Sequence, residues 1–357
     1  MTSTQGFRPN WVSSPGETII DILRERGLSE AEFAKRLGRA EGNVKDLLEG
    51  RATITIAIAQ KLERILGASM EFWMLRDLQY RQNSARLHQV NDEWSSQLPI
   101  GDMIKFGWLA PAPSPSDEMD ACLRFFGVSN VRAWHKKYAH LERLTAFRTS
   151  PSFESRPAAV ATWLRQGEIE AESINCKPWN AKRFRKSLLY IRSLTREKDP
   201  SKFIPELTKR CANSGVAVAI VRAPNGCRAS GATRFLSPEK ALLQLSFRYL
   251  TDDHFWFTFF HEAGHLLLHG EKGFFLEGAG MPTTTEEDEA NDFAARVLVP
   301  DKYQVELSHL RTDTRNVIRF ARRIGVSPGI IVGQLQHLKR LRYNQLNSLK
   351  RRFKWIS

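Results

Sequence analysis

Three histidines stand four residues apart in the run TFFHEAGHLLLHG, residues 258–270, and two of them frame a glutamate in the pattern H-E-x-x-H. Residues four apart on a helix emerge on one face, so His261 and His265 are spaced to bind a single tetrahedral zinc ion. Glu262 would lie beside that metal without being a ligand. A carboxylate there takes a proton from zinc-bound water and returns it to a leaving amine, so the pattern predicts metal-assisted peptide hydrolysis.

The third ligand must come from outside this run. At about 1.5 Å per residue, His269 lies about 12 Å along the helix axis from His261, too far to share one metal on an unbroken helix. No glycine between His265 and His269 turns the chain out of the helix. We therefore expect an acidic ligand from TTTEEDEANDFAARVLVP, residues 283–300, a second predicted helix whose alanines allow close packing. Its first turns hold four acidic residues: Glu286, Glu287, Asp288 and Glu289.

The elements around the motif predict a helix that follows a sheet. Asp252 and Asp253 favour the first turn of a helix over residues 251–268, Gly270 ends it, and the aromatic run FWFTFF would bury it. Upstream, residues 216–223, 227–236 and 240–250 read as three strands. An Asn225-Gly226 turn between the first two indicates a small antiparallel sheet, whose edge strand would hold an extended peptide across the zinc.

Length and composition indicate a soluble protein of more than one domain. A chain of 357 residues exceeds the usual size of a single core, and 42% hydrophobic with 26% charged residues is ordinary for a globular protein. No apolar run of 18 residues and no signal sequence is found, so we expect no membrane association and a cytoplasmic location. The four cysteines form no C-x-x-C pair, which indicates reduced packing residues.

The amino-terminal part predicts a compact five-helix domain. Helical patterns with turn signals between them run from residue 15 to residue 87, and Ser29 followed by Glu32 is a capping-box start. The expected core of this domain is Phe33, Ala34, Leu37, Val44, Leu47, Leu48 and Leu62. The whole chain is therefore expected to be mostly α with a small β-sheet (α+β). The expected divisions are a helix-turn-helix domain (1–87), a connection and helical spacer (88–210), a peptidase domain (211–300) and a basic helical segment (301–357).

This amino-terminal segment resembles the XRE-type helix-turn-helix family, in particular its HigA antitoxin branch, from SPGETIIDIL through ASMEFWMLRDLQ. The resemblance implies that the helix at residues 40–49 enters the DNA major groove, with Glu41, Asn43 and Lys45 facing bases or phosphates. The helix carries more acidic than basic residues, so a dimerisation or partner-recognition module remains the alternative. A homodimer is compatible with either.

Residues from about 213 to 300 resemble the ImmA/IrrE-type metallo-endopeptidase domain, a gluzincin-like fold, through CRASGATRFL, FTFFHEAGHLLLHG and EEDEANDFAARVLVP. The resemblance implies zinc bound by His261, His265 and Glu289, with Glu262 as catalytic base; Glu286, one turn earlier, is the alternative ligand. Members of the family typically cleave a helix-turn-helix repressor. The resemblance thus implies control of a stress-response, mobile-element or toxin-antitoxin type operon.

Charge is concentrated in the carboxy-terminal segment. Residues 301–357 hold 13 Lys and Arg against 3 Asp and Glu, whereas residues 211–300 hold 7 against 11. Two helices are expected around Ser327-Pro328-Gly329, followed by basic residues interleaved with aromatics, a pattern suited to single-stranded nucleic acid. The alternative is a basic flank that docks on the acidic domain. The residues expected to contact nucleic acid are Arg340, Arg342, Lys350, Arg351 and Arg352.

Two functions remain open from the sequence. The first is a zinc endopeptidase, joined to a helix-turn-helix domain, that cleaves a repressor or antitoxin. The second is a HigA-like DNA-binding regulator whose metal domain is a sensor or scaffold with little turnover. The intact Glu262 favours the first, because a purely structural zinc site does not need it.

Overall fold

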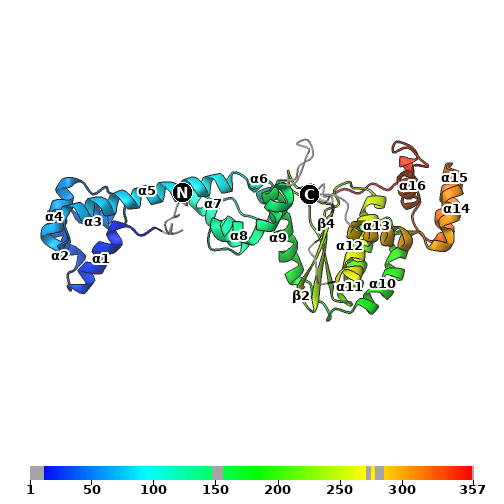
Figure 1. The fold of residues 1–357 in the computed structure, drawn as a ribbon, viewed down its shortest axis with the longest axis horizontal. Coiled ribbons are helices and arrows are strands. Elements are labelled where there is room, and N and C mark those ends of the chain that lie inside the picture. The colour runs from blue at the N-terminus through cyan, green and yellow to red at the C-terminus, as the bar shows by residue number, and fades with distance from the viewer. Residues whose placement is uncertain (1–11, 147–155, 271–274, 278–284, 356–357) are drawn as a thin grey trace, which may run out of the picture. The chain divides into compact units, whose positions relative to one another are not determined.

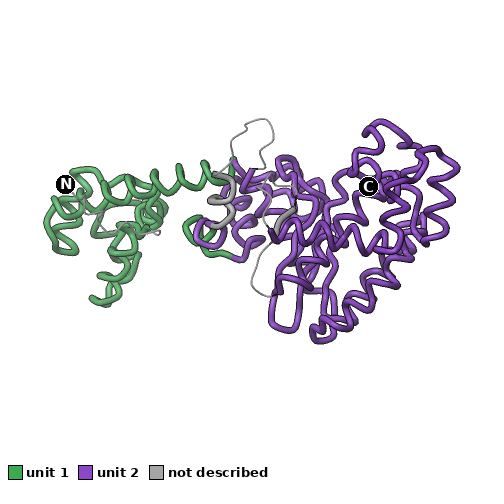
Figure 2. Tube along the Cα trace, turned by 45° about the vertical axis from the view of Figure 1, so that its right-hand side comes forward, with its two compact units in different colours: residues 1–96, 128–134 green, residues 97–127, 135–357 purple. Residues whose placement is uncertain are grey.

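The computed structural model describes residues 12–146, 156–270, 275–277 and 285–355. The chain divides into two compact units, one of residues 1–96 with 128–134 and one of residues 97–127 with 135–357 (Figure 2). Among the described helices, none combines the length and the apolar character needed to cross a bilayer.

The first unit is built from five helices, as predicted. They are α1 (Pro15–Glu25), α2 (Glu30–Leu37), α3 (Glu41–Leu48), α4 (Ile56–Leu66) and α5 (Met70–Ser95). The predicted capping residue Ser29 accepts a hydrogen bond from the Glu32 amide at 3.2 Å, and Gly38 ends α2 in the left-handed conformation at φ 66°. All seven predicted core residues are buried together. Helix α5 continues to Ser95, past the boundary expected at residue 87.

The second unit contains a four-stranded sheet in the order β1-β3-β2-β4. Its strands are β1 (Val216–Ile220), β2 (Gly231–Ser237), β3 (Lys240–Leu245) and β4 (Phe275–Glu277). The prediction of an all-antiparallel sheet is wrong, because β1 pairs with β3 in parallel while β2 pairs antiparallel with β3 and β4. The turn at Asn225-Gly226 therefore does not close a hairpin.

Helices cover both faces of this sheet, with α9 (Pro157–Ser173) on one side and α12 (Asp252–Leu268) on the other (Figure 1). Leu243 and Leu245 of β3 share a core with the aromatic residues of α12. Gln244, between them, points to the other face and donates to the Trp163 carbonyl on α9 at 2.7 Å. Coverage on both faces suits the parallel β1–β3 pair.

The expected spacer in residues 88–210 is largely part of this second unit. It forms α6 (Ile100–Lys105), α7 (Pro115–Phe126), α8 (Val131–Ala146), α9, α10 (Ala181–Leu194) and α11 (Pro200–Ala212). The buried faces of α10 and α11 join the core of the sheet and α12, so these helices build the domain rather than only connecting it to another.

The remainder of the second unit packs around α12. It comprises α13 (Thr285–Leu298), η3 (Asp301–Tyr303), α14 (Gln304–His309), α15 (Thr314–Ile324), α16 (Pro328–His337) and η4 (Asn347–Leu349). Pro328 begins α16, as predicted. The following chain returns to the start of α12, where the Phe353 amide donates to the Leu250 carbonyl at 2.8 Å and the Asp252 amide donates to the Arg351 carbonyl at 3.0 Å.

Candidate metal centre and catalytic site

The histidine pair lies inside the second unit, on the turn of α12 that faces α13. The side chains of His261 and His265 are each 1% exposed, and their Nε2 atoms are 3.0 Å apart. The aromatic residues of α12 bury the rest of the helix against the sheet. Gly264 lets α13 approach, because a Cβ at Gly264 would lie 3.3 Å from the Ala290 Cα. The close packing predicted for these two helices is confirmed.

Glu287 of α13 completes the cluster. Its Oε2 is 3.2 Å from Nε2 of His261, and its Oε1 is 3.4 Å from Nε2 of His265. Burial alone would raise the pKa of Glu287; hydrogen bonds and charge from the two histidines, with protons on their Nε2 atoms, lower it to about 2, and a cation in place of those protons acts in the same direction. Burial lowers the pKa of His265. At neutral pH the site therefore offers an ionised carboxylate.

The two glutamates considered as third ligand lie elsewhere. Glu289 Oε2 is 2.9 Å from Nε2 of His269 and its side chain is 56% exposed, while Glu286 is exposed. The reason is helical phase: residues 287 and 291 are four apart and share the face that meets α12, whereas residue 289 is turned about 200° from residue 287. His269 lies outside the cluster, as its distance along the helix predicted.

Side chains outside the cluster contact the second ring nitrogen, Nδ1, of each histidine and orient its ring. Nδ1 of His261 is 3.0 Å from Oδ1 of Asn291, which is an acceptor, so this Nδ1 carries the proton and Nε2 presents its lone pair. Nδ1 of His265 is 3.0 Å from Nδ1 of His269, which in turn contacts Glu289. If each ring donates outward along this chain, Nε2 of His265 also presents a lone pair. Such partners fix the tautomer and the ring orientation of metal-binding histidines.

The geometry of the donor set fits a small divalent cation. The ligand atoms of His261, His265 and Glu287 all lie within 4.8 Å of one another. Tetrahedral ligands at about 2.0–2.1 Å from zinc are separated by roughly 3.3 Å, and the three separations here are 3.0, 3.2 and 3.4 Å. Two imidazole lone pairs and a carboxylate at such distances repel one another unless a cation lies among them.

Glu262 lies next to this cluster in a closely fitted recess. Its side chain is 0% exposed. Gly231, the first residue of β2, makes room for it, because a Cβ there would lie 2.4 Å from Oε1 of Glu262 and 2.7 Å from Cγ2 of Thr258. The sheet therefore presents β2 directly to the carboxylate that follows the first metal-binding histidine.

In the first unit, the residues expected to contact DNA are exposed on α3. Glu41, Asn43 and Lys45 are all exposed, and Lys45 Nζ is 3.9 Å from Glu49. The acidic residues that follow on this helix are partly neutralised, because Arg51 pairs with Asp46 at 2.7 Å and also with Glu49. The outer face of α3 is thus less acidic than its sequence indicated.

Two of the basic tail residues expected to contact nucleic acid, Lys350 and Arg351, have partners within the second unit. Lys350 Nζ pairs with Asp253 at 2.6 Å, and the two side chains are 10% and 7% exposed. Arg351 donates through NH1 to the carbonyls of Thr195 and Glu197, both at 2.9 Å. The Lys350–Asp253 pair agrees with the alternative that the flank docks on the acidic domain, whereas the side chain of Arg351 binds carbonyls of the preceding helical segment.

Two aromatic residues of the tail, Phe353 and Trp355, pack on the core of the second unit. Phe353 is 7% exposed and Trp355 packs on the same core, so neither is presented for stacking on a base. Arg340, Arg342 and Arg352 are exposed. Tyr343, beside Arg342, is the exposed aromatic residue of the described tail, so any stacking on a base would rest on this ring alone.

A small sheet followed by a helix with paired histidines, facing a glutamate from the next helix, defines the second unit as a metallopeptidase-type domain. In agreement, residues 218–336 match the IrrE N-terminal-like domain of the M78 peptidase family, whose members are metal-dependent. The match continues beyond residue 300, where the sequence led us to end the domain, through α14 and α15 and most of α16. The carboxy-terminal part of the chain thus contains an M78 peptidase domain.

The amino-terminal part is similar to a DNA-binding regulator. Over 60 residues the chain is 35% identical to the uncharacterized HTH-type transcriptional regulator YddM of Escherichia coli (strain K12). The aligned stretch covers 17% of this chain and 64% of the relative. One chain thus combines an amino-terminal part that is similar to an HTH-type transcriptional regulator with a carboxy-terminal part that matches the M78 peptidase family.

Sequence reasoning missed two residues of the site, Glu287 and Asn291. Their spacing was the available signal, because residues four apart on a helix share a face. Ala290 and Ala294, which were recognised as the buried stripe, lie beside that face. Together these positions indicate which side of α13 meets the histidines.

Proposed function

We propose that this chain is a zinc-dependent endopeptidase coupled to a helix-turn-helix domain. It cleaves a transcriptional repressor or antitoxin and so controls a stress-response, mobile-element or toxin-antitoxin type operon. The observation that carries the proposal is the fully buried Glu262 beside the His261, His265 and Glu287 cluster. Burying a carboxylate is costly, and a purely structural metal site has no use for it.

In this proposal His261, His265 and Glu287 hold the ion, and Asn291 and His269 keep the two imidazoles in the ligand tautomer. A bound zinc ion would supply an acidified water and polarise the scissile carbonyl. Glu262 is placed to accept a proton on a carboxylate oxygen and to return it to the leaving nitrogen. The close fit around Gly231 holds the carboxylate in place for both transfers.

The helix-turn-helix unit is proposed to bind DNA through Glu41, Asn43 and Lys45 on α3. Exposure of all three supports this assignment. DNA binding would bring the peptidase to the operator that its substrate occupies. The second candidate function is a HigA-like regulator whose metal domain senses or scaffolds without turnover; the similarity to a transcriptional regulator favours it.

Replacement of Glu262 by Gln separates the two candidates. The variant keeps the size of the side chain and should bind as much zinc as the wild type, measured by elemental analysis. New protein N termini are then compared, by mass spectrometry, between cells that express the wild type and cells that express Glu262→Gln. The proposal expects an internal cut in a helix-turn-helix protein with the wild type only. Identical sets of N termini, with zinc bound in both proteins, would rule out cleavage and favour the second candidate, a regulator whose metal domain has no proteolytic turnover.

A further inference from the structure

A cavity of about 330 Å³ opens beside the candidate catalytic centre. Ser230 and Thr258 line it where it adjoins the centre. Ser230 precedes Gly231, and the Thr258 methyl group and Oε1 of Glu262 both lie against the place where a Gly231 Cβ would stand. The cavity is therefore separated from Glu262 by its neighbours Ser230 and Thr258, and it extends along α12 toward the start of that helix.

The walls of the cavity come from α12, α13, α16 and the chain that follows α16. Phe257, Leu298 and Ile330 provide apolar surface. His337 and Tyr343 lie at the exposed side, where Tyr343 is 78% exposed. One side of the cavity is thus built by the segment that the sequence indicated as a separate basic tail.

The charged groups that line the cavity cancel each other. Asp253 pairs with Lys350 at 2.6 Å, and Lys350 also donates to Oε1 of Gln336 at 2.7 Å. Gly333 of α16 admits Asp253, because a Cβ at Gly333 would lie 3.0 Å from Asp253 Oδ2. Since both charges are used within the pair, the cavity offers no free counter-charge to a ligand.

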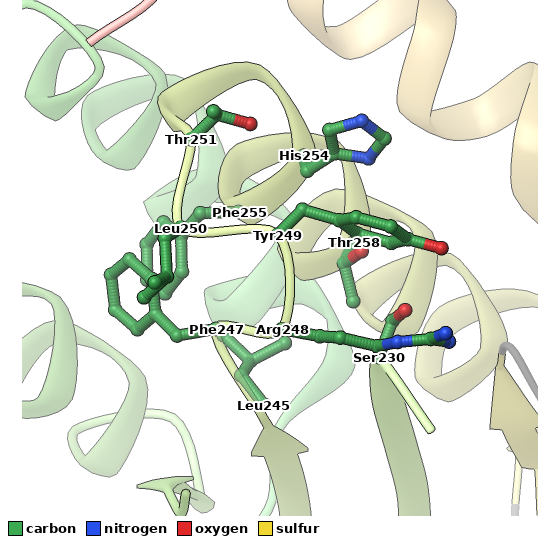
Figure 3. Close-up of a pocket in the computed structure, with 10 residues that line it drawn as sticks. All are labelled: Ser230, Leu245, Phe247, Arg248, Tyr249, Leu250, Thr251, His254, Phe255 and Thr258. Atoms are coloured by element: carbon green, nitrogen blue, oxygen red, sulfur yellow. The ribbon is translucent and has the colours of Figure 1, made fainter. Parts of the chain in front are cut away.

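The side of the cavity nearest the sheet is closed by a stack of side chains. The rings of Tyr249 and His254 are stacked at 4.3 Å, and the Arg248 guanidinium lies 5.1 Å from the centre of the Tyr249 ring. Figure 3 shows the Tyr249 ring between His254 and Arg248, with Thr258 beside it. Residues 254, 258 and 262 are four apart on α12, so the stack continues along the face that carries Glu262.

We propose that this cavity is the substrate subsite adjoining the scissile bond and that it binds one bulky, uncharged side chain. The inference rests on the proposed peptidase function. The volume of the cavity is at the lower end of the range of about 300–1,000 Å³ for ligand pockets, which suits a single large side chain. The apolar walls favour burial of such a group, and a charged side chain would lose its hydration without gaining a partner.

The test uses amino-acid hydroxamates, which anchor on zinc and present one side chain to the neighbouring pocket. Alanine, leucine, tryptophan, glutamate and lysine hydroxamates are titrated calorimetrically into the zinc-loaded full-length protein. Burial of a large apolar side chain predicts that the leucine and tryptophan compounds bind about tenfold or more tightly than the alanine compound. The glutamate and lysine compounds should bind no better than alanine.

Variants that fill the cavity with a tryptophan side chain test whether the preference for large side chains arises there. Gln334 lines the cavity and is 7% exposed, so Gln334→Trp should abolish the preference for large side chains, with the leucine and tryptophan compounds binding no more tightly than the alanine compound. His337→Trp, at an exposed lining position, repeats the test if the first variant fails to fold. Arg319→Trp, exposed on α15 and outside the lining, is the control and should behave as the wild type.

The outcomes separate the subsite from the proposed function. Binding of alanine hydroxamate with no preference for larger side chains overturns the subsite and leaves the metal centre standing. If both Gln334→Trp and His337→Trp keep the preference for large side chains, the hydroxamate side chain binds outside this cavity, and the proposed subsite is also overturned. No binding of any hydroxamate, alanine included, overturns the metal centre and the subsite together.

Discussion

Exchange of Glu287 and of Glu289 for alanine, one at a time, gives a sharp contrast in metal affinity. Both glutamates lie on α13 two residues apart, so the variants are matched in charge and in helix context. The Glu287 oxygens lie 3.2 and 3.4 Å from the two histidine Nε2 atoms, whereas Glu289 reaches the centre only through His269 and His265. Only the first exchange removes a ligand.

The expected magnitudes follow from that difference. Structural zinc sites with four ligands bind with about 10–16 kcal/mol, which is roughly 3 kcal/mol per ligand. Glu287→Ala should therefore weaken zinc binding by about 3 kcal/mol, or roughly 100-fold. Glu289 is 56% exposed and acts through two intervening rings, so its loss should weaken binding by about tenfold at most, the low end for outer partners.

Zinc affinity is measured by competition with a chromophoric chelator on the full-length protein. Circular dichroism on both variants controls for folding, which neither exchange should disturb because both residues lie in the first turns of α13 and alanine favours a helix. Equal losses in the two variants, or a larger loss in Glu289→Ala, would refute the assignment of Glu287. The motif-based assignment of Glu289 would then stand.

Three further predictions concern single positions. Asn291→Ala should weaken zinc binding by about 10–100-fold, since it orients His261; an unchanged affinity in the chelator assay would remove that role. Gly231→Ala should lower the free energy of unfolding by about 1–3 kcal/mol, because its Cβ would lie 2.4 Å from Glu262 Oε1. Gly101→Ala, with no atom within 4 Å of its Cβ, is the control, and equal denaturant midpoints would contradict the close fit. Lys45→Ala should reduce the salt slope of DNA binding by about one; an unaltered slope would exclude a phosphate contact.

The helix-turn-helix unit was predictable because its signals are local. Each of α1, α2, α4 and α5 begins at a Ser or Thr whose side chain accepts an amide of the first turn. Apolar residues three and four apart then define the buried faces. The length of α5 was underestimated because its second half has few buried residues, so the pattern fades while the helix continues.

The second unit was less predictable because its organisation depends on long-range packing. Helix α9 lies in the expected helical spacer, but its place on the sheet was not predicted, since residues 158–164 are buried on all sides and leave no amphipathic period. In the parallel pairing of β1 with β3, the strand that lies between them in sequence, β2, is not between them in the sheet, and no local turn signal indicates such an arrangement. The tail residues Lys350 and Arg351 read as free charges until their partners, far away in sequence, are known.

About half of the candidate site was predictable from the sequence. His261, Glu262 and His265 follow from one helical turn, so their relation needs no knowledge of the fold. The third ligand depends on the phase with which α13 meets α12, and a shift of two positions moves a side chain about 200° around the helix. Asn291 indicates which face of α13 meets α12, because it shares a face with Glu287 and contacts His261.

The most direct test of this account is anomalous diffraction at the zinc absorption edge from crystals of the zinc-loaded protein. The account predicts one peak about 2.0–2.2 Å from Nε2 of His261, from Nε2 of His265 and from a Glu287 oxygen. Protein that takes up no zinc, or a peak held by His269 and Glu289 instead, would contradict it.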